Sequence, residues 1–190
     1  VIAPTSKAYA ILQRYGVDCP MAVIPSGIDL EQFLRPMTAE ERTRRRTRLG
    51  ISETDRVILY LGRLAKEKNV EELFAFLQAS ENKGVRLLLV GDGPHREVLK
   101  RIAYNRGISD RVIFAGAVSP DEVANYYKLG DIFASASQSE TQGLTYIEAM
   151  ASGLPILCRD DSCLRGIVEN GYNGFTYVSQ ADFKTYASRL

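Results

Sequence analysis

Short apolar runs alternate with amphipathic stretches along most of the chain, at the spacing of β-α-β units. The apolar runs predict β-strands over residues 21–24, 56–61, 85–90, 111–115, 131–135, 154–158 and 174–178. The intervening stretches predict helices over residues 5–15, 39–49, 70–79, 95–105, 120–129, 144–152 and 162–170, and another that starts near Ala181. Strands that alternate with helices form parallel sheets covered on both faces, joined by right-handed crossovers. The sequence therefore predicts an α/β fold, with a Rossmann-like parallel sheet and helices on both of its faces.

The composition is that of an ordinary folded domain. The 190 residues are 45% hydrophobic and 25% charged, values that exclude disordered and fibrous classes. Lys and Arg number 24 against 23 Asp and Glu, so the net charge is +1 and no nucleic-acid partner is expected. No apolar run approaches the roughly 18 residues of a membrane span. We expect residues 1–190 to form a single domain.

Cysteine and histidine limit the metal and redox chemistry that this sequence can support. The chain has three cysteines, Cys19, Cys158 and Cys163, without C-x-x-C spacing. We expect them to be reduced thiols in a reducing compartment. His95 is the single histidine, which excludes any site that needs two imidazoles. The chain starts without Met and stops within a predicted helix, from which we expect a fragment of a larger protein.

Glycines follow four consecutive predicted strands in the middle of the chain. They are Gly62 after 56–61, Gly91 and Gly93 after 85–90, Gly116 after 111–115, and Gly143 after 131–135. Parallel sheets bind ligands outside the carboxyl ends of their strands, and these exits share one edge. A single glycine there is ordinary turn chemistry. Glycines at four exits of one edge indicate backbone that approaches a ligand.

The exit at Gly143 is the most informative, because a helix is predicted to begin there. A helix N-terminus offers free N–H groups and a partial positive charge, which favour a phosphate. Arg63 and Lys68 follow the strand at 56–61 and bring a planar guanidinium and an ammonium to the same edge. For either residue alone, a solvated loop would be the simpler explanation. Together with the helix N-terminus, they favour a diphosphate site.

Two carboxylates bracket the start of the same helix. Glu140 precedes it, and Glu148 lies about 1.5 turns inside it. Ile147, Ala149 and Met150 are apolar, so the helix is expected to be largely buried, where a lone carboxylate is costly. We therefore expect Glu148 to accept hydrogen bonds from vicinal hydroxyls, such as those of a ribose or a sugar.

These motifs resemble those of retaining glycosyltransferases, specifically glycosyltransferase family four. Residues 140–155, with glutamates at 140 and 148, resemble its E-x7-E signature, from which Gln142 departs because Phe or a similar residue usually stands there. Three further segments resemble its phosphate loop, its G-x-G-P turn and its I-P-N-G segment: Gly62-Arg63-Leu64 with Lys68, Gly91-Asp92-Gly93-Pro94, and Ile24-Pro25-Ser26-Gly27-Ile28-Asp29 with Phe33. The family fold is GT-B, and the resemblance implies that this chain is its C-terminal, donor-binding half.

The resemblance implies a role for each matching residue. Arg63 and Lys68, with Gly62 in the same loop, bind the donor diphosphate and stabilise the leaving group. Backbone N–H groups at the helix start hold the phosphate, and the donor-binding residues there are Gly143, Leu144 and Thr145. Glu148 holds the ribose hydroxyls, Glu140 contacts the transferred sugar, and Val118 lies where the family places the base. Glu140, Arg63 and Lys68 are thus the expected catalytic residues.

Within the family, residues 3–7 and 15–20 look most like bacterial diacylglycerol glucosyltransferases, which make glucolipids. The implied reaction moves a hexose, expected to be glucose, from a nucleoside-diphosphate sugar, expected to be UDP-glucose, to an acceptor such as diacylglycerol. A missing N-terminal domain would bind the acceptor. The sequence shows no carboxylate cluster with metal geometry, so Arg and Lys are expected to replace a divalent ion and no cofactor is expected. The implied location is cytoplasmic, peripheral at the inner face of the membrane.

Two other functions compete with this interpretation. The first is a non-catalytic module that binds a nucleotide sugar, since the acceptor half is absent. The second is an NAD-binding dehydrogenase domain, since the sheet is Rossmann-like. The G-x-G-x-x-G motif of such domains is broken here, because Arg96 stands where the third glycine belongs.

A run of basic residues lies on the helix predicted at 39–49. Its members are Arg42, Arg44, Arg45, Arg46 and Arg48. The helix is polar all round, so a solvated face is the simpler expectation. The alternative is attraction to an anionic lipid surface, at about 1 kcal/mol per basic residue.

Overall fold

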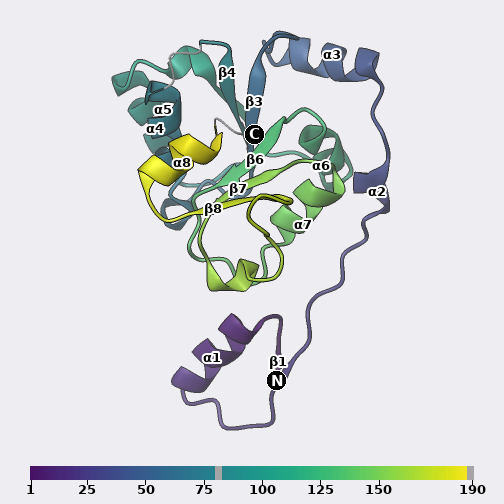
Figure 1. Ribbon diagram of the computed structural model, residues 1–190, viewed down its shortest axis with the longest axis vertical. Coiled ribbons are helices and arrows are strands. Elements are labelled where there is room, and N and C mark those ends of the chain that lie inside the picture. The colour runs from purple at the N-terminus through teal and green to yellow at the C-terminus, as the bar shows by residue number, and fades with distance from the viewer. Residues whose placement is uncertain (80–82, 188–190) are drawn as a thin grey trace.

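Six parallel strands form the central sheet, in the order β5-β4-β3-β6-β7-β8 (Figure 1). The computed structural model describes residues 1–79 and 83–187. The strands of this sheet are β3 (Arg56–Leu61), β4 (Val85–Val90), β5 (Val112–Gly116), β6 (Ile132–Ser135), β7 (Ile156–Arg159) and β8 (Gly174–Tyr177). The predicted parallel α/β fold is therefore confirmed.

Helices cover both faces of the sheet, as the sequence predicts. One face packs against α4 (Glu71–Ala79), α5 (Arg96–Asn105) and α8 (Gln180–Ala187), and the other against α2 (Glu31–Leu34), α3 (Ala39–Arg48), α6 (Pro120–Tyr127) and α7 (Leu144–Ala151) (Figure 1). Alternate residues of β3 serve the two cores: Ile58 and Tyr60 join the first, and Val57 and Leu59 the second. Burial of both faces explains why the strand sequences are mostly apolar rather than alternating.

Two local predictions are wrong. Residues 162–170 do not form an α-helix, because only a 3₁₀ turn (η3, Ser162–Leu164) forms there before Gly166 takes φ +77°. Residues 25–36, for which neither a helix nor a strand is predicted, contain the short helix α2. Its Phe33 is 2% exposed and meets Tyr127 edge-on, with ring centroids 5.8 Å apart, and this burial stabilises a helix of only four residues.

The first residues form a unit of their own, set apart from the central sheet. Strands β1 (Ile2–Ala3) and β2 (Ala22–Val23) pair in parallel around helix α1 (Ser6–Arg14). This unit lies at the lower end of the molecule in Figure 1, and the extended segment at residues 24–30 joins it to α2. Its two strands are not hydrogen-bonded to the six-stranded sheet. The structure therefore contains two separate sheets. Whether residues 1–190 fold as one domain stays a prediction.

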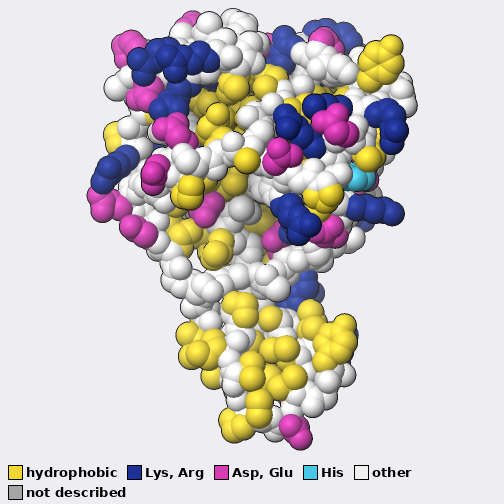
Figure 2. Space-filling view, turned by 180° about the vertical axis from the view of Figure 1, so that it is seen from behind, with side chains coloured by type: hydrophobic (Ala, Val, Ile, Leu, Met, Phe, Trp, Pro, Cys, Tyr) yellow, Lys and Arg dark blue, Asp and Glu magenta, His cyan; other side chains and the backbone are white. Residues whose placement is uncertain are grey.

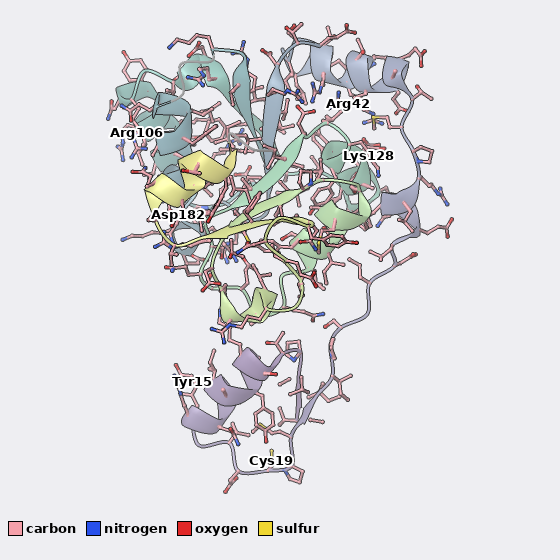
Figure 3. The ribbon with its side chains drawn as sticks, in the orientation of Figure 1. Tyr15, Cys19, Arg42, Arg106, Lys128 and Asp182 are labelled. Atoms are coloured by element: carbon pink, nitrogen blue, oxygen red, sulfur yellow. The ribbon has the colours of Figure 1, made fainter. Side chains whose placement is uncertain are left out.

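The basic helix α3 is held by ion pairs rather than solvated all round. Asp131, at the start of β6, accepts hydrogen bonds from Arg42 at 2.8 Å and from Arg46 at 2.9 Å, and Arg46 is only 2% exposed. Arg42 also donates to the carbonyl oxygen of Lys128, and Figure 3 shows these two labelled residues on neighbouring elements. Arg45 pairs with Glu122 at 2.6 Å. The expected solvated face is therefore wrong for these three arginines, because acidic and carbonyl groups of the body bind them.

The ion pairs around α3 lower the pKa of Asp131. Burial alone would raise the pKa of its carboxyl group. The N–H of Val57, which donates to it at 2.7 Å, and the charges of Arg46 and Arg42 outweigh this and hold the pKa of Asp131 below its usual value. Within the described residues, Arg44 and Arg48 are the two arginines of the run without a side-chain ion pair.

Candidate functional site

The strand order reverses between β3 and β6, which are neighbours in the central sheet although β4 and β5 lie between them in the chain. Chain-successive strands run outward from β3 to β5 on one side and from β6 to β8 on the other. The crevice outside the carboxyl ends at such a reversal is the preferred ligand site of an open α/β sheet. Residues 62–68 follow β3 and residues 136–143 follow β6, so these two loops flank the crevice. The structure thus brings together the two loops that carry Arg63, Lys68, Glu140 and Gly143.

Lys68 and Glu140 meet across this crevice. Lys68 ends a 3₁₀ turn (η1, Lys66–Lys68), and its Nζ donates to Glu140 Oε1 at 2.8 Å. The two side chains are 21% and 17% exposed, so the pair is reachable from solvent. Lys68 Nζ also lies 3.5 Å from Ser137 Oγ. An anion that enters the crevice would find Lys68 already neutralised by Glu140, and would have to compete with that carboxylate.

Helix α7 begins at the same crevice with free backbone donors. Gly143 is its N-cap, with φ +71° and ψ 45°, a left-handed conformation that glycine adopts at no steric cost. A Cβ atom there would lie 2.9 Å from Leu164 Cδ2 and 3.0 Å from Tyr146 Cδ2. The first N–H groups of a helix have no intrahelical acceptor. Within the described part of the chain, those of Leu144 and Thr145 have no other protein acceptor, and so they are available to an anion.

Arg63 lies on the other side of the crevice, directly after β3. It is exposed, and among the described residues its guanidinium has no ion-pair partner. Its carbonyl oxygen accepts a hydrogen bond from Tyr60 at 2.9 Å, which anchors the backbone while the side chain stays free. Burial and the charge of Glu140 raise the pKa of Tyr60, so its hydroxyl stays protonated and donates. Gly62 precedes Arg63 with φ +155°.

Among the residues that the structure describes, the carboxylate of Glu148 has one hydrogen-bond partner, Tyr127 of α6. The Tyr127 hydroxyl donates to Glu148 Oε2 at 2.8 Å and lies 3.1 Å from the carbonyl oxygen of Thr145. Burial, then the charge and hydrogen bond of Glu148, raise the pKa of Tyr127, which keeps it a donor. One carboxylate oxygen is thus fixed, and the second can accept from a ligand hydroxyl. Tyr127 packs in the core and also orients Glu148.

Gly91 and Gly93 lie against neighbouring backbone, which leaves no room for a side chain at either position. A Cβ at Gly91 would lie 2.1 Å from the Gly62 carbonyl oxygen, and one at Gly93 2.3 Å from that of Leu64. Backbone hydrogen bonds, including Leu64 N–H to Asp92 oxygen at 3.0 Å, continue the β3–β4 pairing into these loops. Contacts within the protein therefore account for both glycines, and the approach of a ligand to this exit stays a prediction.

Val118 lies at the far end of the same edge. It follows β5, three strands from β6, and its half-buried side chain packs against the core that contains α6 and α7. Adjacent strands are about 4.8 Å apart, so β5 and β6 are separated by about 14 Å. An elongated ligand would therefore be needed to touch both Val118 and Glu140.

Several contacts of the loops after β6 and β7 with residues 5–26 are not predicted by the sequence. The amide of Gln142 makes two hydrogen bonds to Ser26: Oε1 accepts from its N–H at 3.1 Å, and Nε2 donates to its carbonyl oxygen at 3.0 Å. Thr5 Oγ1 donates to the carbonyl oxygen of Thr141 at 2.7 Å. Lys7 Nζ pairs with Asp161 at 2.7 Å. The sole signal in the sequence was that Gln142 departs from the family pattern.

Two further observations concern metal binding and membrane insertion. Across residues 1–79 and 83–187, no three His, Cys, Asp or Glu side chains are grouped as metal ligands. No helix within these ranges is long and apolar enough to cross a membrane.

A doubly wound sheet with cationic side chains and a helix N-terminus at its strand reversal is an α/β domain suited to an anionic ligand. Residues 41–190 match the family model described as glycosyl transferases group 1. The chain belongs to this family, as its motifs indicate. The alternative of a dehydrogenase domain is incompatible with this membership.

Two curated relatives resemble the chain over nearly its whole length. It is 40% identical over 186 residues to an alpha-monoglucosyldiacylglycerol synthase of Streptococcus pneumoniae, covering 96% of this chain and 42% of the relative. It is 37% identical over 179 residues to the protein of the same name from Acholeplasma laidlawii, covering 93% and 45%. The chain therefore spans less than half the length of these relatives.

Solved structures share the fold. Anabaena Alr3699/HepE in complex with UDP-glucose matches with a TM-score of 0.87 at 23% identity, covering 100% of this chain and 53% of that one. Sucrose-phosphate synthase from Thermosynechococcus elongatus matches with a TM-score of 0.83 at 26% identity, covering 100% and 48%. Both are GT-B glycosyltransferase structures, so the predicted fold class is confirmed.

Proposed function

We propose that this chain is the donor-binding part of a retaining glycosyltransferase that moves glucose from UDP-glucose to a lipid acceptor. One observation carries the proposal: the loop that holds Arg63 and Lys68 and the free N–H groups of helix α7 flank the same strand reversal. These groups suit the diphosphate of a nucleotide sugar, because a guanidinium, an ammonium and a helix N-terminus all favour negative charge.

The proposed mechanism follows from where charge develops. The bond between the sugar anomeric carbon and the diphosphate oxygen breaks, and the electron pair leaves with UDP. Arg63, Lys68 and the N–H groups of Leu144 and Thr145 stabilise that charge without reorganising. The acceptor hydroxyl forms the new bond to the anomeric carbon on the face that UDP leaves, and its proton passes to the departing phosphate. These fixed cations act in place of a divalent ion, so we propose that no metal is required.

The remaining residues would hold the rest of the donor. Glu148, oriented by Tyr127, accepts from the ribose hydroxyls through its free oxygen. Val118 lies about 14 Å along the edge, in reach of the base. Glu140 would contact the transferred glucose, once the diphosphate takes over its partner Lys68.

The identity of the substrates rests on the relatives. Both curated relatives described above are named alpha-monoglucosyldiacylglycerol synthases, which supports glucose as the sugar and a diacylglycerol-type acceptor. The structure titled as a UDP-glucose complex supports UDP as the nucleotide. An enzyme with a lipid acceptor works at a membrane surface, and we propose a cytoplasmic protein bound peripherally at the inner face of the membrane.

We also propose that a second, N-terminal domain binds the acceptor and packs against the β1-α1-β2 unit. Parallel sheets are normally buried on both faces, and a two-stranded sheet is not stable alone. Figure 2 shows apolar side chains gathered over this unit, and its exposed members include Ile2, Tyr15, Val23 and Ile24. Figure 3 labels Tyr15 at the end of α1, and Cys19 at the end of this unit far from the central sheet. The chain also spans only 42% of the pneumococcal relative, which leaves length for such a domain.

Calorimetric titration of the chain with UDP and UDP-glucose tests the donor assignment, with ADP, GDP and NAD as controls. The proposal predicts saturable binding of the uridine nucleotides, lost in Lys68→Met and weakened in Glu148→Gln. Binding of none of them, or preference for NAD, would contradict it. Transfer of labelled glucose to diacylglycerol by a protein that includes the second domain separates an enzyme from a non-catalytic module, which would bind UDP-glucose and transfer nothing.

A further inference from the structure

We propose that Gln142 is a positioning residue, which fixes the loop of Glu140 and Gly143 against the segment at Ser26 and so sets the affinity for the sugar diphosphate. This inference rests on the proposed function. Gln142 lies between two residues assigned to the donor, two positions after Glu140 and one before Gly143. Where the family pattern has an aromatic residue, this chain has an amide.

The side-chain amide of Gln142 and the backbone of Ser26 form a pair of hydrogen bonds, which we call the clasp. The Gln142 side chain is 9% exposed, and both ends of its amide are used on one peptide segment. Oε1 accepts from the Ser26 N–H at 3.1 Å while Nε2 donates to the Ser26 carbonyl oxygen at 3.0 Å. A reciprocal pair of this kind fixes both distance and orientation, which a single hydrogen bond does not. An aromatic ring at this position could offer neither bond.

Other contacts tie the same loop to the same part of the chain. Thr5 Oγ1 donates to the Thr141 carbonyl oxygen at 2.7 Å, one residue before Gln142. Lys7 Nζ reaches the Gln138 carbonyl oxygen in this loop at 3.3 Å, and both oxygens of Asp161, which follows β7, hold the same ammonium at 2.7 Å. Residues 5–26 therefore hold the loop on one side.

The loop's own hydrogen bonds are weaker than these tethers. Ser137 Oγ lies 3.4 Å from Ser139 Oγ and 3.4 Å from the Ser139 N–H, both at the long end of the hydrogen-bond range. The position of Glu140 is then decided by Lys68 on the crevice side and by the clasp on the other. Release of the clasp would let Glu140 and the start of α7 move, while Val118 and the β5 exit stay in place.

The test measures three ligands that probe successive parts of the site. Uridine reaches the base and ribose positions, UDP adds the diphosphate, and UDP-glucose adds the sugar. For Gln142→Met, which keeps the length and loses both bonds, we expect about tenfold weaker UDP-glucose binding, a smaller loss for UDP, and uridine affinity within about twofold of wild type. Gln142→Asn keeps a polar amide that is too short to span, and the same order of losses is expected.

Gln138→Met is the matched control. Gln138 lies in the same loop, its side chain is exposed, and within the described residues that side chain has no hydrogen-bond partner. We expect wild-type affinity for all three ligands. Thermal unfolding followed by circular dichroism verifies that each variant is folded at the titration temperature.

The outcomes separate this inference from the function on which it rests. If wild type binds no uridine nucleotide, the proposed function fails. If wild type binds UDP-glucose and both Gln142 variants bind it equally well, the positioning role is overturned. A uniform loss for uridine, UDP and UDP-glucose would also overturn it, because a general structural defect lowers all three affinities together.

Discussion

Replacement of Glu140 by Gln should strengthen the binding of UDP, although Glu140 is one of the expected catalytic residues. In the structure Glu140 Oε1 lies 2.8 Å from Lys68 Nζ and neutralises it. The diphosphate must therefore displace a carboxylate and then remain close to it. Glutamine keeps the shape of the side chain and removes the charge, so Lys68 becomes fully available to the phosphates.

The size of the effect follows from the repulsion between Glu140 and a phosphate bound to Lys68. Two unit charges at a separation of about 6 Å interact by about 0.7 to 2.8 kcal/mol as the effective dielectric constant falls from about 80 to about 20. The Lys68 and Glu140 side chains are 21% and 17% exposed, so solvent screens them and the lower part of that range applies. We expect a gain of about 1 kcal/mol, which is about a fivefold lower Kd for UDP.

Calorimetric titration at low and at high salt measures this gain and its electrostatic origin. The gain should shrink at high salt, because solvent-exposed charges are screened. UDP-glucose should gain less than UDP, since the substitution also removes the carboxylate expected to contact the sugar. Glu67→Gln is the matched control: Glu67 is exposed, adjoins Lys68 in sequence, and within the described residues has no ion-pair partner. It should change the Kd for UDP by less than about twofold.

Three results would contradict this prediction. The first is weaker UDP binding in Glu140→Gln, which would mean that Glu140 holds Lys68 in its binding position rather than competing for it. The second is unchanged UDP binding in Lys68→Met, which would remove Lys68 from the phosphate site. A gain of the same size in Glu67→Gln would show a general effect of net charge.

Three further predictions concern stability, and each is read by circular dichroism because the chain has no Trp. Asp131→Asn leaves the buried Arg46 without its counter-ion, so the free energy of unfolding in urea should fall by about 3 kcal/mol and the midpoint of thermal unfolding by about 6–12 °C. The pKa values of Asp131 and Asp161 are lowered in the folded state, despite burial that opposes this, chiefly by backbone N–H groups and nearby cations. Their contribution to stability is therefore complete above the unfolded value of about 4 and is lost as the pH falls below it, so the deficit of Asp131→Asn measured at pH 7 should shrink at pH 3. Gly91→Ala places a Cβ atom 2.1 Å from the Gly62 carbonyl oxygen, so this variant should not give the native spectrum.

Much of the fold could be predicted because the central strands are buried on both faces. The predicted strands at 56–61 and 85–90 match β3 and β4 residue for residue, since each contains an uninterrupted apolar run, 57–61 or 87–90, that is followed by a glycine. The prediction of a helix at 162–170 was wrong because the apolar residues of this segment are buried without forming an α-helix. Asp161 accepts from the Cys163 N–H, and Gly166 then turns the chain with a positive φ.

The candidate site was predicted only in part, because the signals that reveal it are local. The sheet order brings the exits after β3 and β6 together, and with them Lys68 and Glu140, as the motif spacing indicates. The bonds between Gln142 and Ser26 join residues 116 positions apart, and no periodic pattern points to them. Tyr127 is likewise a buried aromatic residue whose hydroxyl partner is decided by how α6 packs beside α7.

We propose above that the start of α7 and the loop after β3 bind the diphosphate of a nucleotide sugar. The most direct test is the chemical-shift change of backbone amides when UDP is titrated into the ¹⁵N-labelled chain. The account predicts saturable shifts that are largest at Gly143, Leu144 and Thr145 and at Arg63 and Lys68, with uridine alone shifting chiefly the β5 exit near Val118. Saturable binding that shifts amides away from the carboxyl edge of the sheet, and leaves Leu144 and Thr145 unmoved, would contradict it.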